Sequence, residues 1–202
     1  MTSQVVATVA GERVWSADVD EREARLRSSR TATALPRPGT SEGRQLRRWL
    51  TQLMVTERVV AAEAAALGLR AADAPEERDL LPDTVARMEL GSVAASVLRA
   101  PLARALFVHL TAAVDVADAD VADYHARNPT RFGATPSTAG WSRRRPAPLD
   151  EVRPAIAEHL RAAGRRRTFR RWLDARCAEL VELAPGYEHP GDPRQPDNTH
   201  RH

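Results

Sequence analysis

The C-terminal segment carries the residues whose types most directly suggest chemistry. Imidazole and carboxylate groups are common ligands of zinc, iron, nickel and copper. Three histidines in this segment could together hold such a divalent metal: His189, His200 and His202. Nearby carboxylates could join them: Glu188, Asp192 and Asp197. The spacing matches no standard metal motif. Two alternatives therefore stay open: a solvated tail, or a segment that docks on the domain as a lid over a pocket.

Other polar residues could take part in acid–base or nucleophilic chemistry. Three carboxylates precede His125 and could form a cluster with it: Asp118, Asp120 and Asp123. The start of a helix favours acidic residues in any case, so a capping role is the preferred interpretation. His109 is expected in a core or at its boundary. Cys177 is expected to act as a small buried hydrophobic residue rather than as a nucleophile. The sequence assigns no catalytic residue.

Arginine clusters could bind nucleic acid or an acidic partner. All 30 basic residues in the Lys and Arg count are arginine, whose guanidinium pairs with carboxylates and phosphates. The clusters lie at these positions: Arg44 with Arg47 and Arg48, Arg143–Arg145, and Arg165–Arg171. The net charge of +3 falls short of the broad basic field of a nucleic-acid-binding protein. Solvated helical faces paired with Glu and Asp are therefore the preferred interpretation, and nucleic-acid binding is a second alternative.

Large apolar residues offer a different kind of site. A groove for an extended or unfolded polypeptide could be lined by these residues: Trp15, Trp49, Met54, Met88, Phe107 and Trp172. Each of them could equally belong to a core. A groove requires a contiguous exposed apolar surface, so the distinction depends on the three-dimensional structure.

The composition favours a mainly helical protein. The chain has 202 residues, is 43% hydrophobic and only 4% aromatic, and is rich in alanine. These values suit helices around one core, with or without a tail. The single cysteine excludes an intramolecular disulfide and a Cys-based zinc cluster. No stretch is apolar enough to span a membrane and no signal-peptide pattern is present, so we expect a cytoplasmic protein. A homodimer stays open.

Local patterns predict the elements of the first half. Residues 5–14 predict a short strand, a turn at Gly11 and a second short strand. A helix follows with Ser16 as its N-cap. The strongest helical pattern starts at Ser41 and ends where Gly68 occupies the position of a C′ glycine.

Later helices are predicted from caps, breaks and apolar spacing. Asp73 is a second cap signal, and Pro82 interrupts the helical pattern. Further helices are predicted over these stretches: about 84–99, about 102–113, from Asp118 to Asn128, and from Asp150 to about Pro185. The remaining chain, 185–202, is rich in proline and predicts an extended tail.

Four separated segments resemble, in order, the SurA/PrsA/PpiC-type parvulin chaperone family. They are VATVAGERV at 6–14, LTQLMVTERVVAAEAAALGL at 50–69, VADADVADYHARNPTRF at 116–132, and LDEVRPAIAEHL at 149–160 followed by Trp172-Leu173. The resemblance implies a SurA-N-like helical domain whose last helix packs back on the N-terminal half. It also implies that the segment after that helix pairs with the N-terminal strand.

The family resemblance also implies the division of the chain. Its segments are a helical half over 1–132, a linker over 133–148 in place of the parvulin domain, a completing helix over 149–184, and the tail over 185–202. The linker contains no His, Cys or Asp, so no catalytic residue of the family can be carried over. Prolyl isomerase activity is therefore not expected.

The leading hypothesis is a chaperone-like or scaffold module that binds a polypeptide or a partner protein. The alternative is a metal-binding enzyme or enzyme accessory that uses the histidine tail, for example in actinobacterial specialised metabolism. Its site would lie between the helical domain and the folded-back tail.

Overall fold

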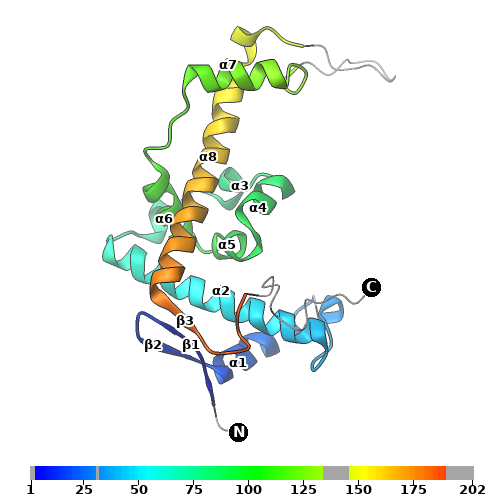
Figure 1. Ribbon diagram of the computed structural model, residues 1–202, viewed down its shortest axis with the longest axis vertical. Helices are drawn as coiled ribbons and strands as arrows, with labels where there is room; N and C mark the ends of the chain where they lie inside the picture. The colour runs from blue at the N-terminus through cyan, green and yellow to red at the C-terminus, as the bar shows by residue number, and fades with distance from the viewer. Residues whose placement is uncertain (1–2, 31, 134–145, 190–202) are drawn as a thin grey trace. The chain divides into compact units, whose positions relative to one another are not determined.

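The structure, a computed structural model, describes these parts of the chain: residues 3–30, 32–133 and 146–189 (Figure 1). Helices make up most of the described residues, and three strands form one small antiparallel sheet. This confirms the mainly helical class that the composition predicted.

The chain forms two compact units. The first comprises Met1–Leu106 with Arg170–His202, and the second comprises Phe107–Phe169. Both boundaries fall within helices. The sequence analysis instead placed its segment boundaries near residues 132 and 149, so the two divisions differ.

A hairpin opens the first unit. Strand β1 (Val5–Val9) pairs antiparallel with β2 (Glu12–Trp15). The two turn residues, Ala10 and Gly11, have φ angles of 49° and 84°. Two positive φ angles are typical of the tight turns that suit twisted hairpins, and glycine adopts such an angle without a steric cost. The predicted hairpin and its turn at Gly11 are confirmed.

The third strand completes the sheet from the far end of the chain. Helix α8 (Leu149–Leu180) ends earlier than predicted, and β3 (Val181–Leu183) follows it directly. The strand pairs antiparallel with β1 and gives the order β2-β1-β3. The sequence pattern predicted a helix as far as about Pro185, because Val181 fits the apolar helical spacing. The structure corrects this, because the open edge of β1 supplies hydrogen-bond partners to these residues. It confirms the strand pairing that the resemblance implied.

The two long helices of the first half begin close to their predicted starts. Ser16 is the first residue of α1 (Ser16–Arg27), rather than its cap, and its Oγ accepts from the Gln4 backbone N–H at 3.1 Å. Helix α2 (Ser41–Ala66) is capped by Thr40, whose Oγ1 accepts from a backbone N–H in the first turn. Gly68 follows α2 with a φ of 64°, as a C′ glycine should.

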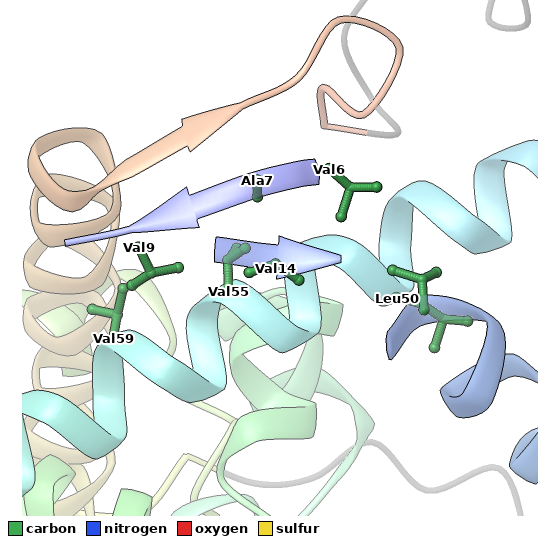
Figure 2. Packing of buried hydrophobic residues seen from close by; sticks show 8 residues of the cluster. Val6, Ala7, Val9, Val14, Leu50, Val55 and Val59 are labelled. Carbon is green, nitrogen blue, oxygen red and sulfur yellow. The ribbon is translucent and has the colours of Figure 1, made fainter. Parts of the chain in front are cut away.

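The core of the first unit lies between the sheet and α2. Figure 2 shows valines of the hairpin against the apolar side of α2. The fully buried members are Val6, Ala7, Val9, Val14, Val19, Leu50, Val55 and Val59. Each fully buried valine or leucine stabilises the fold by about 1.5–3 kcal/mol. Leu180 and Tyr187 pack on the same cluster, so the end of α8 returns to the N-terminal half as the resemblance implied.

Short helices follow α2. They are α3 (Glu77–Leu80), α4 (Thr84–Leu90), α5 (Ser92–Val97) and α6 (Pro101–Thr111). The predicted single helix over 84–99 is wrong, because Gly91 has a φ of 91° and separates α4 from α5. The predicted cap at Asp73 instead ends a 3-10 turn, Ala71–Asp73.

The second unit contains α7 (Asp118–Arg127) and the first part of α8. Val121, Val152 and Ile156 form its buried cluster. The ring of Phe107 lies 5.1 Å from that of Phe169. No helix in the described part of the chain is both long enough and apolar enough to cross a membrane.

Candidate functional site: two pockets beside α2

The first pocket is called the α1 pocket, because α1, α2 and α5 line it. Its volume is about 330 Å³. Its lining exposes polar and apolar groups in similar amounts, and the apolar members are Leu26, Trp49, Leu50, Leu53, Val97 and Ala100. Trp49 presents an indole there, which combines a large apolar surface with a polar N–H. The α1 pocket can therefore accept a large apolar side chain.

Charged residues edge the α1 pocket. Arg22 and Glu57 form an ion pair of 2.8 Å between Nη2 and Oε1, with each side chain 35% exposed. Arg99, just beyond the end of α5, is exposed and lines the same pocket. Its side chain makes no hydrogen bond or ion pair with any residue in the described parts of the chain.

The second pocket is called the α8 pocket, because α8 lines it together with α2 and α5. Its volume is about 240 Å³. Its polar lining residues include Gln52, Thr56, Ser92, Arg170 and Asp174. Leu90, Val93 and Leu173 contribute apolar surface. Both pockets therefore expose polar as well as apolar groups.

Cys177 lies in the α8 pocket and is half-buried. Burial raises the pKa of its thiol, and the nearby Asp174 carboxylate raises this pKa further. A hydrogen bond with Thr56 acts in the opposite direction without reversing the shift in the pKa. The thiolate is the nucleophilic form of cysteine, so the raised pKa leaves Cys177 poorly suited to nucleophilic catalysis at neutral pH.

A short C-terminal strap, defined as Pro185–His189, lies along α2. Arg48 Nε donates to the Gly186 carbonyl at 3.1 Å, and Gln52 Nε2 donates to the Tyr187 carbonyl at 3.3 Å. These bonds hold the strap so that His189 lines the α8 pocket. The contacts of these five residues with α2 agree with the docking alternative for the start of the tail, and residues 190–202 lie outside the described part of the chain.

One hydrogen bond joins the walls of the two pockets. Trp49 Nε1 donates to Ser92 Oγ at 3.1 Å. Trp49 lines the α1 pocket, and Ser92 lines the α8 pocket. The contact between α2 and α5 thus separates two openings that share these helices as walls.

The six residues predicted to bind a polypeptide have different environments. Trp49 lines the α1 pocket, whereas the other five line neither pocket. Phe107 is only 1% exposed and belongs to the core of the second unit, so it presents no surface to a partner. Met88 on α4 is 74% exposed. The remaining three are half-buried: Trp15, Met54 and Trp172.

The predicted metal ligands fall partly outside the described residues. His189 lines the α8 pocket, while His200 and His202 lie outside the part of the chain that the structure describes. Within residues 3–30, 32–133 and 146–189, no three His, Cys, Asp or Glu side chains gather in a group that could hold a metal ion. The three-histidine metal site stays a prediction.

The predicted acid–base residues of α7 make structural contacts. Asp118 accepts from Arg153 at 3.4 Å, and a ring nitrogen of His125, Nε2, lies 2.9 Å from the Ala147 carbonyl oxygen. Asp120 lines a separate pocket of about 290 Å³ in the second unit. His109 is exposed on α6, so its predicted position in a core or at the boundary of one is wrong.

The arginine clusters are partly structural as well. Arg47 bridges Asp20 and Glu23, at 2.6 and 2.8 Å. Arg166 is only 5% exposed, and Arg170 Nη1 donates to the Glu89 carbonyl at 3.3 Å. The Arg47 ion pairs agree with the preferred interpretation of solvated helical faces paired with Glu and Asp, whereas the buried Arg166 departs from it. The cluster at 143–145 lies outside the described residues.

Several pocket residues were not identified from the sequence. Arg22, Glu57 and Arg99 come from α1, α2 and the end of α5, and no local motif links them. The spacing of Glu57 after Leu53 places it on the same side of α2, which is the one signal available. Their gathering depends on how three helices pack.

Comparisons with known proteins give a partial likeness. The model for a "Family of unknown function (DUF7158)" matches residues 5–42. The matched stretch contains the hairpin, α1 and the first residues of α2. No curated protein and no solved structure matched the chain. The likeness thus concerns the N-terminal part and carries no stated activity.

Proposed function

We propose that this protein binds an extended polypeptide segment, as a chaperone-like or scaffold module. The observation that carries the proposal is the α1 pocket, a cavity of about 330 Å³ beside α2 whose apolar lining residues are Trp49 and five aliphatic residues. A pocket of this lining can bury one large side chain of a partner. Such burial contributes about 1.5–3 kcal/mol to binding before ordering costs.

The neighbouring α8 pocket supports an extended ligand. The Trp49–Ser92 hydrogen bond places the two pockets on either side of one helix contact. Successive side chains of an extended segment could therefore use both openings. The polar groups of the α8 pocket, including Ser92 and Asp174, would serve the backbone and polar side chains of such a segment.

We further propose that the helical domain is a SurA-type module without prolyl isomerase activity. The pairing of β3 with β1 supports this, as does the return of the end of α8 to the core. The proposal includes a polypeptide or partner protein as ligand and a cytoplasmic location, where Cys177 would remain a thiol. Fractionation of cells that express the native gene tests the location.

Filling the α1 pocket tests the proposed function. Ala100 is an exposed residue of this pocket, so Ala100→Trp places a bulky ring at the site without removing a core side chain. Fluorescence anisotropy with labelled, unstructured, leucine-rich peptides should show binding to the unmodified chain. We expect Ala100→Trp to weaken this binding about tenfold, which corresponds to about 1.4 kcal/mol.

Ala62→Trp serves as the matched control, because Ala62 is exposed on α2 and lines neither pocket. Circular dichroism checks that both variants keep their helical content. The absence of peptide binding by the unmodified chain, or equal weakening by both tryptophan substitutions, would contradict the proposal.

A further inference from the structure

The charge at the edge of the α1 pocket points to one class of polypeptide segment, and this inference rests on the proposed polypeptide binding. Three charged residues line the pocket: Arg22, Glu57 and Arg99. The first two neutralise one another in their ion pair of 2.8 Å. Arg99 makes no ion pair with any described residue. The α1 pocket thus combines apolar lining residues with one positive charge that has no counter-charge among the residues that the structure describes.

A guanidinium group has a definite chemical preference. Its planar N–H groups donate two parallel hydrogen bonds to a carboxylate of the ligand. A neutral amide in place of that carboxylate offers only one oxygen and no charge, and an ammonium group offers no acceptor and repels the guanidinium. We propose that the α1 pocket recognises an apolar residue that is followed or preceded by Asp or Glu. The apolar side chain would contact Trp49 and Leu53, while the acidic side chain pairs with Arg99.

The acidic group is assigned to a side chain within the segment rather than to a chain end. The α8 pocket lies on the other side of the Trp49–Ser92 bond, so a segment that uses both pockets continues past the α1 pocket. A C-terminal carboxylate at Arg99 would end the ligand there. The two-pocket arrangement therefore favours an internal Asp or Glu.

A set of labelled peptides tests this specificity on the full chain. The peptides have ten residues, an amidated C-terminus and a central pair that is Leu-Asp, Leu-Asn or Leu-Lys. They differ only in the second residue of this pair, which is the residue expected to face Arg99. We expect Leu-Asp to bind about three- to fivefold more tightly than Leu-Asn, as for a partly exposed ion pair, and Leu-Lys to bind most weakly. Arg99→Glu should reverse this order, so that Leu-Lys binds most tightly.

Arg171→Glu is the matched control. Arg171 is exposed on α8, belongs to the same unit and lines neither pocket, so its reversal changes the net charge equally. It should leave the preference for Leu-Asp in place. An equal shift in both variants would overturn the inference, because it would indicate the overall charge of the protein rather than Arg99.

The remaining outcomes separate the inference from the function on which it rests. Equal affinity for all three peptides would overturn the acidic preference and leave polypeptide binding intact. A neutral peptide that carries its only carboxylate at a free C-terminus, and binds as tightly as the Leu-Asp peptide, would overturn the internal assignment. Failure of every peptide to bind would overturn both the inference and the proposed function.

Discussion

Glu23 shows how a single buried charge is held in this fold. The residue is only 8% exposed, yet its carboxylate accepts from Arg27 at 2.8 Å and from Arg47 at 2.8 Å. Burial alone would raise the pKa of Glu23, but the hydrogen bonds and positive charges of the two arginines outweigh burial and lower it. The carboxylate thus joins α1 to α2, two of the helices that line the α1 pocket.

The lowered pKa of Glu23 fixes the direction of its pH dependence. The folded-state pKa of Glu23 lies below its ordinary value of 4.5. The contribution of Glu23 to the free energy of unfolding is therefore complete above pH 4.5 and is lost as the pH falls through the folded-state pKa. We expect Glu23→Gln to lower the free energy of unfolding by about 1–3 kcal/mol at pH 7. Urea unfolding at a series of pH values should show that the difference in the free energy of unfolding between the two proteins becomes smaller in acid.

Glu21→Gln provides the control at this scale. The Glu21 side chain is 69% exposed and pairs with Arg25 at 3.5 Å, so its removal should change the free energy of unfolding by at most about 0.5 kcal/mol. A loss at Glu23 no larger than the loss at Glu21, or one that does not depend on pH, would contradict the account of the buried carboxylate.

At the scale of elements, the C-terminal strap has no regular secondary structure but is fixed by its contacts. The side chain of Tyr187 packs on the core cluster, and its carbonyl accepts from Gln52. The Gly186 carbonyl accepts from Arg48. These contacts keep His189 at the α8 pocket. The strap thus links the sheet to a pocket wall.

Two truncations measure what the strap contributes. A chain that ends at Ala184 loses the packing of Tyr187 and both hydrogen bonds to α2, whereas a chain that ends at His189 retains them. We expect the shorter chain to be less stable than the longer one by about 2–4 kcal/mol in denaturant unfolding. Equal stability of the two truncated chains would show that the strap contributes nothing to the fold.

Elements defined by local signals were predictable from the sequence. The turn at Gly11 and the end of α2 at Gly68 follow from glycine positions. The helix start predicted near residue 84 matches α4, where the Asp83 carboxylate accepts from the Ala86 backbone N–H as an N-cap. The break at Gly91 was missed, because a lone glycine within an apolar pattern is compatible with a continuous helix. The sequence analysis assigned strand β3 to the end of α8, because a segment of three residues is too short for its apolar pattern to distinguish a strand from a helix.

At the scale of the whole molecule, the pocket walls depend on contacts between distant parts of the sequence. Trp49 and Ser92 are separated by 43 positions, and no pattern in either helix specifies their hydrogen bond. The sequence could name Trp49 as a large apolar residue but not its place in a pocket. It could not distinguish the exposed Met88 from the buried Phe107, because both are large apolar residues within predicted helices. Tertiary packing decides between a surface and a core position.

The central claim is that the α1 pocket receives a polypeptide segment, and photo-crosslinking tests it most directly. A leucine-rich peptide with a photoreactive side chain in place of its central leucine is irradiated with the full chain, and mass spectrometry locates the crosslinks. The account predicts crosslinks to the residues that line the α1 pocket, such as Leu26, Ser96 and Ala100, and their loss when unlabelled peptide competes. Crosslinks confined to α7, or an absence of crosslinks that unlabelled peptide can displace, would contradict the account.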